Sequence, residues 1–590
     1  TTVIERSAIE SSGARNLGEI LRPVVGVRVA TTGGLGSFTP ISIRGSSNDQ
    51  VLVLVDGRRL NAAQGGGVDL SDIPLDDIER IEVVRGGASA IHGSDAIGGT
   101  VNLVTRSAET GGEAGARLEY GTNDTKLATL HLANGRDDAA WRLDVRRCLS
   151  DGWLRVAENG SPVTGTDDSD GGRDDLDMIW GSGRITWRPA WASRIDLSGT
   201  HESSDKGVPG STEFSSPFAR QEDEFSSAVI ELGGLFAGAS AASGARVYAQ
   251  RRLRGYEDPE YPLGAIDDQH RNDAWGASFD QDRDLGRGGR LKAGVEWRRE
   301  ELMSTTDGHH LRSSAAAWVR DAIALDDAGD VELTPALRWD GVSDFDGRVS
   351  PMLMGRWTVS PTVTWRASAG GAFRPPAFDD LFQPPRASAA GNPDLKPEHS
   401  WNGDLGVTLT PGAWSFGVTG FVNRVHDLIQ WQPGAAGVWR PHNVDGARII
   451  GAEVELAGPI GLPGSARVVN LSANYTALDP RETGEASNTA GKVLIYRPRH
   501  RLNAQARLPL GRWEIDTQWG YTGPVYTTRA NTKSLPGYVV GDAGVRWQVR
   551  AGLDVEGRVL NLTDEQYQDI RDYPAPGREW RLALVGRTGS

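Results

Sequence analysis

The stretch LKAGVEWR, residues 291–298, indicates the fold class, because every second side chain in it is apolar. A period of two is that of a β-strand with one apolar and one polar side. The same alternation recurs from about residue 117 to the end of the chain. Examples are residues 141–146, 331–339, 513–521, 545–549 and 580–584.

A transmembrane β-barrel fits this alternation better than a soluble β-sandwich, which also alternates. The series is long, Trp often ends a stretch, and charged residues occupy the opposite face, as in a polar lumen. The chain has 19 Trp, a residue favoured at membrane interfaces. Some connections are turn-like (134–138, 285–289), whereas others are long and polar (151–177, 207–224, 255–271, 383–400). Short turns on one side and long loops outside the cell are typical of outer-membrane barrels.

Composition excludes several other classes of protein. The chain has 590 residues, of which 38% are hydrophobic, and no run approaches the ~18 apolar residues of a membrane helix. A net charge of −15 without a basic block argues against a nucleic-acid-binding protein. The single cysteine, Cys148, excludes an internal disulfide framework and a Cys-rich metal site.

The sequence pattern of residues 1–106 differs from that of the rest of the chain, and it predicts a compact α/β unit. Apolar spacing predicts a helix over residues 7–21 that ends at Pro23. Strand-like runs follow at 41–44, 51–55 and 78–84, and the wholly apolar run 51–55 predicts burial on both faces. Gly-rich loops at 31–38 (TTGGLGSF) and 62–67 (AAQGGG) separate the runs. We therefore predict two domains, residues 1–106 and 107–590.

Several long motifs resemble those of TonB-dependent outer-membrane receptors. Residues 41–57 (ISIRGSSNDQVLVLVDG) and 78–106 (IERIEVVRGGASAIHGSDAIGGTVNLVTR) resemble the family's plug. Residues 373–397 (FRPPAFDDLF to GNPDLKP), 443–455 and 561–567 resemble motifs of its barrel. The resemblance covers nearly the whole chain. It implies an all-β transmembrane barrel of about 22 antiparallel strands in a bacterial outer membrane, with an N-terminal α/β plug domain inside the lumen.

Within the family, the cobalamin (vitamin B12) receptors look closest. The similar stretches are VLVLVDGRRLN (51–61), VDLSDIP (68–74), SAIHGSDAIGG (89–99), GVPG (207–210) and YRPRH (496–500). The resemblance implies TonB-dependent active uptake of a scarce nutrient, with cobalamin or another corrinoid as the leading substrate. A ferric siderophore is the alternative, because siderophore receptors share much of the pattern. No recognised glycosidase, protease or nucleotide motif is present, so we do not expect an enzyme.

Three further functions are less favoured. Haem receptors usually carry a His between the FR and NP motifs, and residues 374–392 contain none, although His92 is a candidate iron ligand in the plug. A passive porin would lack a plug of 106 residues. A surface-binding or adhesin barrel without transport is the alternative from another class, and it predicts a plug that never moves.

The Gly-rich plug loops are the candidate substrate site. Gly permits close approach of a ligand to the backbone, and by resemblance these loops point outward and touch the substrate. The competing interpretation is that they are only tight connections. The candidate residues are Thr31, Thr32, Gly34, Leu35, Ser37, Phe38, Ala62, Gln64, Gly65 and Gly66.

An acidic stretch, TDDSDGGRDDLD at 166–177, is a candidate calcium site. Ca2+ takes six to eight oxygen ligands, and cobalamin receptors have calcium sites in an early extracellular loop that a neighbouring loop completes. The alternative is a solvated acidic loop. The candidate ligands are Asp167, Asp168, Asp170, Asp174, Asp175 and Asp177, completed by Tyr256, Glu257, Asp258, Asp267 or Asp268.

Arg44 and Arg85 are each followed by Gly in the plug. The resemblance implies that such arginines pair with glutamates of the barrel wall and hold the plug in place. Glu453 and Glu455 are the candidate partners. Because side chains alternate between the two faces of a strand, both lie on the same face, and the sequence does not choose between them. Ordinary salt bridging in the lumen is the other interpretation.

The resemblance also implies partners. TonB, the inner-membrane coupling protein, would bind an N-terminal TonB box, which we do not find, since Thr1 already lies close to the plug's first strand. The chain ends in LVGRTGS rather than in the family's usual aromatic residue, and residues 1–22 show no signal peptide. We also expect contact with outer-membrane lipids and, as a candidate, with a surface lipoprotein, but none with nucleic acid.

Overall fold

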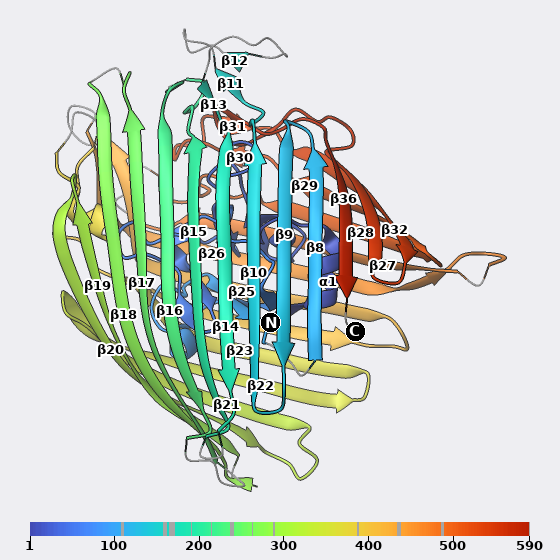
Figure 1. The fold of residues 1–590 in the computed structure, drawn as a ribbon. Coiled ribbons are helices and arrows are strands. Elements are labelled where there is room, and N and C mark those ends of the chain that lie inside the picture. Colours follow the sequence, from blue (N-terminus) through green and yellow to red (C-terminus); the bar gives the residue numbers. More distant parts are fainter. Residues whose placement is uncertain are drawn as a thin grey trace.

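The computed structural model describes most of the chain as a barrel that encloses an N-terminal plug (Figure 1). The described residues are 1–107, 111–156, 162–163, 172–189, 192–213, 215–235, 241–261, 264–286, 289–385, 389–433, 438–465, 467–484 and 489–588. No helix in this part of the chain is long and apolar enough to cross a membrane.

The barrel is closed and antiparallel, and it contains 22 strands within the described residues. The last strand pairs with the first, with Arg581 opposite Gly121, so the sheet has no free edge. The predicted barrel is therefore confirmed. Its strands are β8 Gly111–Gly121, β9 Thr125–Gly135, β10 Ala139–Ser150, β14 Leu176–Trp187, β15 Arg194–Gly207, β16 Arg220–Gly233, β17 Ala241–Asp258, β18 Ile266–Asp284, β19 Arg290–Ser304, β20 Gly308–Ala324, β21 Val331–Val342, β22 Phe345–Ser360, β23 Val363–Arg374, β24 Glu398–Leu409, β25 Ser415–Pro433, β26 Trp439–Gly461, β27 Val468–Glu482, β28 His500–Leu510, β29 Trp513–Thr522, β32 Tyr538–Arg550, β33 Leu553–Leu560 and β36 Glu579–Thr588.

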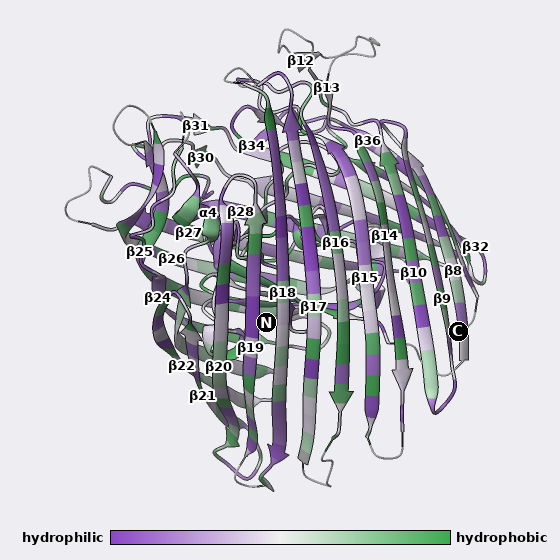
Figure 2. Ribbon diagram, turned by 60° about the vertical axis from the view of Figure 1, so that its left-hand side comes forward, coloured by the Kyte–Doolittle hydropathy of each residue, from purple (hydrophilic) through white to green (hydrophobic). Residues whose placement is uncertain are grey.

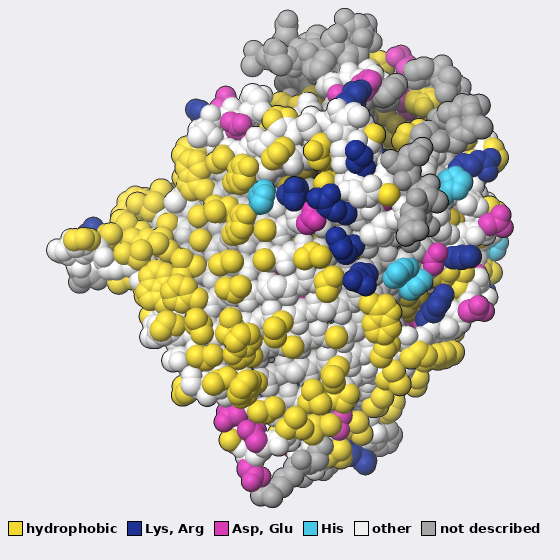
Figure 3. All heavy atoms as spheres, turned by 180° about the vertical axis from the view of Figure 1, so that it is seen from behind, with side chains coloured by type: hydrophobic (Ala, Val, Ile, Leu, Met, Phe, Trp, Pro, Cys, Tyr) yellow, Lys and Arg dark blue, Asp and Glu magenta, His cyan; other side chains and the backbone are white. Residues whose placement is uncertain are grey.

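Hydrophobic and hydrophilic residues follow one another along many of the strands (Figure 2), and side chains of a strand alternate between its two faces. In β10, Trp141 and Leu143 point outward and are 45% and 42% exposed, whereas Arg142 and Asp144 are buried inside. The two buried charges pair at 2.6 Å between Nη2 and Oδ1. Hydrophobic side chains also spread broadly over the outer wall on the face shown in Figure 3.

Outward-facing Trp residues lie near both ends of the strands, as interfacial aromatic residues do. Trp141, Trp187, Trp357, Trp365, Trp513 and Trp547 lie near the end with short turns, and Trp401, Trp439 and Trp580 lie near the other end.

The two ends of the barrel differ in their connections. Short turns join strands at one end, for example residues 136–138 and 361–362, and the first and last barrel strands begin and end there. Long loops occupy the opposite, extracellular end. They carry β11 Arg155–Val156, β12 Pro162–Val163, β13 Gly172–Arg173, α4 Phe378–Phe382, β30 Val525–Tyr526, β31 Ser534–Leu535, β34 Gln568–Ile570 and β35 Tyr573–Pro574.

The plug is an α/β unit around a mixed sheet of order β1-β6-β7-β4-β5. The run 51–55 is almost fully buried, as its apolar sequence predicts. The predicted helix over 7–21 is wrong in extent, because Gly13 (φ 66°) ends the first helix and Asn16 caps a second one. The plug elements are β1 Thr2–Glu5, α1 Arg6–Ser12, α2 Leu17–Leu21, β2 Val27–Val29, β3 Ile41–Ile43, η1 Asn48–Gln50, β4 Val51–Val55, β5 Arg58–Arg59, β6 Ile78–Arg85, α3 Ser89–His92 and β7 Gly99–Thr105.

Candidate functional site

The first Gly-rich loop, residues 31–38, lies at the extracellular side of the plug and is partly packed against the wall. The Thr31 hydroxyl donates to the carbonyl of Gly33 at 2.8 Å. Leu35 packs against an apolar cluster that contains Leu176. Phe38 is 47% exposed, so an aromatic ring is open to a ligand. Of the predicted residues here, Phe38 is exposed, Thr32, Gly34, Leu35 and Ser37 are half-buried, and Thr31 is buried.

Asp174 joins this loop to the long connection that follows β10. It is buried, and its two carboxylate oxygens accept from the backbone N–H of Gly34 (3.0 Å) and of Leu154 (2.8 Å). Burial raises the pKa of Asp174 to about 6, against the lowering effect of these hydrogen bonds. A Cβ at Gly34 would lie 2.7 Å from Trp153 and 2.9 Å from Asp174, so only glycine fits this approach.

The second Gly-rich loop, residues 62–67, is held by the barrel on two sides. Asn272 of β18 donates to the side-chain oxygen of Gln64 at 2.8 Å. From the other side, the backbone N–H of Asp379 donates to the carbonyl of Gln64 at 3.0 Å. Gly65 is exposed, whereas Ala62, Gln64 and Gly66 are half-buried. Both Gly-rich loops therefore present one exposed residue each on the side that faces the cell exterior.

Helix α4 is the element of this site that sequence reasoning missed. Its Phe378 N–H donates to the carbonyl of Ala63 at 2.8 Å, and its Phe382 stacks on His310 with ring centroids 3.8 Å apart. Burial and the neighbouring Asp307 raise the pKa of Asp379. The motif FRPPAFDDLF marked this segment in the sequence, but nothing in it indicates contact with residues 62–67.

The structure describes only part of the candidate calcium site. Asp167, Asp168 and Asp170 lie outside the described residues. Asp175 pairs with Arg220 (3.1 Å) and Asp177 with Arg147 (2.5 Å). In the part of the chain that the structure describes, no group of three or more His, Cys, Asp or Glu side chains is arranged to hold a metal ion.

The neighbouring loop contributes one unusual carboxylate. Asp258, at the end of β17, is 1% exposed, and its Oδ2 has no hydrogen-bond partner among the described residues. Tyr256 is half-buried on the same strand. Asp267 accepts from Gln269 at 3.1 Å, and Asp268 accepts from Thr306 at 2.6 Å.

The plug arginines meet the wall at Glu453 of β26. The Nε and Nη2 of Arg44 each lie 2.9 Å from a carboxylate oxygen of Glu453, and both side chains are buried. Arg85 lies 3.6 Å from Glu453 and 3.6 Å from Glu455, which is 43% exposed. The structure thus brings the predicted residues together and places Glu453 at the centre of the contact.

The whole arrangement, a plug bonded inside a closed barrel, matches one family in both of its parts. Residues 1–100 match the TonB-dependent receptor plug domain, and residues 113–562 match the TonB dependent receptor-like beta-barrel. The chain belongs to the TonB-dependent receptor family. Receptors of this family are outer-membrane proteins that interact with TonB, and they are not enzymes.

Curated relatives of this TonB-dependent receptor resemble it over most of their length. The vitamin B12 transporter BtuB of Photobacterium profundum is 26% identical, over 98% of this chain and 91% of its own. The same transporter of Vibrio vulnificus (strain YJ016) is 27% identical, over 98% and 91%.

Solved structures of siderophore receptors share the fold of this receptor. The ferric enterobactin receptor PfeA of Pseudomonas aeruginosa has a TM-score of 0.80 at 20% identity and covers 100% of this chain and 99% of its own. The siderophore receptor PirA of Acinetobacter baumannii has a TM-score of 0.79 at 17% identity, covering 100% and 98%.

Proposed function

We propose that this receptor takes up cobalamin or a related corrinoid across the outer membrane. The observation that carries the proposal is the sequence similarity to vitamin B12 transporters at 26–27% identity, which spans the plug as well as the barrel. The siderophore receptors are similar at 17–20% identity, and this likeness concerns the fold. A ferric siderophore is therefore the second candidate.

The plug apex supplies the surface on which such a ligand would rest. Phe38 and Gly65 are the exposed members of the two Gly-rich loops. An exposed aromatic ring gives a planar ligand an apolar contact, and a glycine lets the ligand approach the backbone closely. The long outer loops then close around the ligand.

Transport requires the plug to move, because the plug fills the lumen and bonds to the wall. TonB would pull on the plug from the inner-membrane side, with energy from the proton gradient, since the outer membrane carries no ATP. Buried pairs such as Arg44 with Glu453 keep the plug in place until that pull arrives. A surface-binding barrel without transport would need no such release.

A titration of the purified receptor with cyanocobalamin, followed by calorimetry, tests the ligand. We expect saturable one-to-one binding that Phe38→Ala weakens. Phe416→Ala is the matched control, because Phe416 is 40% exposed on β25 near the short-turn end of the wall. Absence of cyanocobalamin binding together with binding of a ferric siderophore would contradict the corrinoid assignment and leave the family assignment intact.

We also propose that calcium orders the extracellular loops before the ligand binds. Supporting this are the buried, unpartnered Oδ2 of Asp258 and the acidic sequence of residues 166–177. Chelation of calcium is expected to weaken ligand binding in the native receptor but not in Asp258→Asn. Equal affinity with and without chelator in the native receptor would contradict this proposal.

A further inference from the structure

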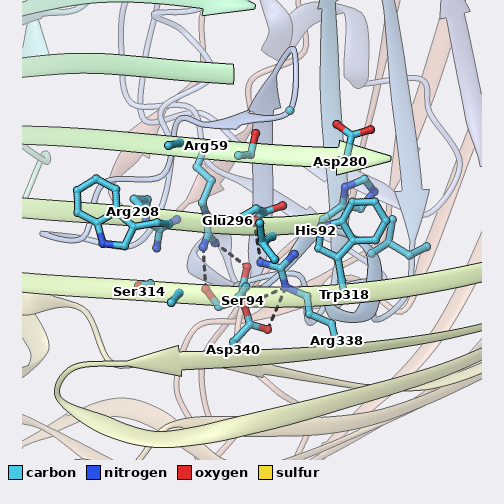
Figure 4. A pocket seen from close by; sticks show the side chains of 18 of the residues that line it. Arg59, His92, Ser94, Asp280, Glu296, Arg298, Ser314, Trp318, Arg338 and Asp340 are labelled. Atoms are coloured by element: carbon cyan, nitrogen blue, oxygen red, sulfur yellow. Dashed lines mark hydrogen bonds and ion pairs between the residues drawn. The ribbon is translucent and has the colours of Figure 1, made fainter. Parts of the chain in front are cut away.

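A cavity of about 300 Å3 lies between the plug and one side of the barrel wall (Figure 4). The plug contributes Arg59 of β5, His92 of α3 and Ser94. Strands β17 to β21, together with Phe373 of β23, contribute the wall, mostly from the halves nearer to the short turns. The cavity therefore lies below the plug apex, on the way from the outer loops to the periplasm.

The plug is bonded to the wall over much of its circumference, but not to four adjacent strands, three of which line this cavity. Ion pairs or hydrogen bonds join the plug to β8, β10, β14, β15, β17, β18, β23, β24, β26, β27, β28, β32 and β36. Across the described residues, none joins the plug to β19, β20, β21 or β22. We call these four strands the unbonded sector.

In the unbonded sector the plug packs against the wall, and charges attract at longer range, Arg59 with Glu300 and Asp95 with Arg298. Gly93, next to α3, lies so close to β21 that an added Cβ would be 3.0 Å from Arg338. A plug that separates from this wall would break no hydrogen bond there, whereas elsewhere it would break buried ion pairs, which is strongly unfavourable. A gap between plug and wall therefore opens at the lowest energy in this sector.

The cavity is lined by more cations than carboxylates. Six cationic side chains line it, against three carboxylates: Arg59, Arg246, Lys292, Arg298, Arg320 and Arg338, with Asp280, Glu296 and Asp340. The carboxylates that pair with Arg59, Arg246 and Arg298 are Asp95, Glu231 and Glu300, which do not line the cavity.

Two of the cations are the most available to a ligand. The guanidinium group of Arg320 has no hydrogen bond or ion pair within the described part of the chain, and Lys292 lies 3.6 Å from its partner Asp280. Arg338, in contrast, is held by Glu296 at 2.8 Å and by Asp340 at 2.9 Å.

Two other observations agree with a positive, donor-rich environment. A buried guanidinium nitrogen of Arg59 and one of Arg338 lack an acceptor among the described residues. The pKa of His92 is lowered to about 4, first by burial and then by Arg320 and Arg338. Because its imidazole is neutral, His92 adds no charge to the cavity. The excess of cations over carboxylates therefore comes from the arginines and the lysine.

We infer that this cavity binds an oxyanion group, a phosphate or carboxylate, of a solute that passes between the plug and the unbonded sector. Guanidinium and ammonium groups bind such groups through charge-assisted hydrogen bonds. The inference that a solute passes here rests on the proposed transport function, whereas the inference that the cavity binds an oxyanion does not. A free inorganic anion has the same chemistry as an oxyanion group on the solute. The experiments below must therefore separate these two sources of the bound anion.

Selenate soaked into crystals of the native receptor tests the site, because selenium can be located by anomalous diffraction. We expect a peak within the cavity near Arg320 and Lys292, and phosphate binding by calorimetry. The double variant Arg320→Gln/Lys292→Gln should lose the peak and weaken phosphate binding by about tenfold or more. Arg366→Gln, an exposed cation on β23 outside the cavity, should change neither. No peak in the native cavity, or a peak that persists in the double variant, would overturn the site.

Uptake of a phosphate-bearing solute by cells separates the two sources. Slower uptake by the double variant with unchanged surface binding supports a group carried by the passing solute. If the double variant no longer binds selenate but takes up the solute at the native rate, the solute does not pass through this cavity, and the site binds a free anion. Thermal unfolding of each variant shows whether the fold is retained.

Discussion

Glu453 is a barrel residue that contacts two plug residues, Arg44 and Arg85. Replacing it removes the negative charge and leaves the two buried guanidinium groups only longer ion pairs, Arg44 with Asp404 at 3.5 Å and Arg85 with Glu455 at 3.6 Å. We expect Glu453→Gln to weaken the attachment of the plug by about 3–5 kcal/mol and to speed trypsin cleavage of the plug in the purified receptor.

Glu455→Gln is the matched control, because Glu455 is on the same face two residues away but is 43% exposed. An exposed ion pair contributes only about 0–1 kcal/mol, so cleavage should change little. Equal cleavage rates for the two variants would show that burial of Glu453 does not hold the plug.

Asp174 gives the apex loop a dependence on pH. Its pKa is raised by burial from 3.8 to about 6, so the folded state favours the protonated carboxyl. The stability that Asp174 contributes is therefore full below pH 3.8 and is lost as the pH rises through about 6. In Asp174→Asn we expect hydrogen exchange of the Gly34 amide, corrected for intrinsic rates, to lose this pH dependence.

Asp175→Asn is the control for this measurement, since Asp175 pairs with Arg220 and not with the apex loop. The native pH profile should persist in it. A profile in Asp174→Asn that equals the native one would refute the role of Asp174.

Only the outer face of each barrel strand contacts the lipid bilayer. Leu337, in the middle of β21, is 48% exposed on the outer face, while its neighbour Arg338 is buried in the lumen. Leu337→Arg is expected to destabilise the barrel by about 2–4 kcal/mol, because a cation at the bilayer midplane is poorly solvated. Val331→Arg, on the same face at the end of the strand, should lower the free energy of unfolding by only about 0–1 kcal/mol.

Denaturant unfolding of both variants in lipid vesicles measures this difference. Equal stability of the two variants would mean that this face of β21 does not meet the bilayer core.

Properties that depend on the sequence of a single strand could be predicted from the sequence. Properties that depend on how the plug contacts the barrel could not. Alternation predicts that Arg142 and Asp144 face the lumen, because a period of two is local. It cannot choose between Glu453 and Glu455, since their depth against the plug decides which one is buried. Nor does any pattern predict that α4 contacts residues 62–67, which lie more than 300 residues away in the chain.

The helix over residues 7–21 shows a second kind of failure. Its apolar spacing continues through the break, because Ile9 and Leu17 both pack into the plug core. Gly13, with a positive φ of 66°, nevertheless ends α1. Spacing reports which side chains are buried, and the backbone conformation of one glycine decides where the helix ends.

The molecule combines a wall with an apolar outer face and a plug that the proposed transport requires to move. Polar bonds attach the plug to most of the wall and leave the unbonded sector free. This asymmetry makes separation on one side less costly than removal of the whole plug.

Uptake of radiolabelled cyanocobalamin into a Gram-negative host that lacks its own cobalamin receptor tests the proposed function most directly. Cells expressing the full-length receptor should accumulate the vitamin, and accumulation should cease when TonB is deleted or the proton gradient is collapsed. Binding to the cell surface should persist in both conditions. Accumulation that continues without TonB, or no accumulation although the receptor is present and binds at the surface, would contradict TonB-driven cobalamin uptake.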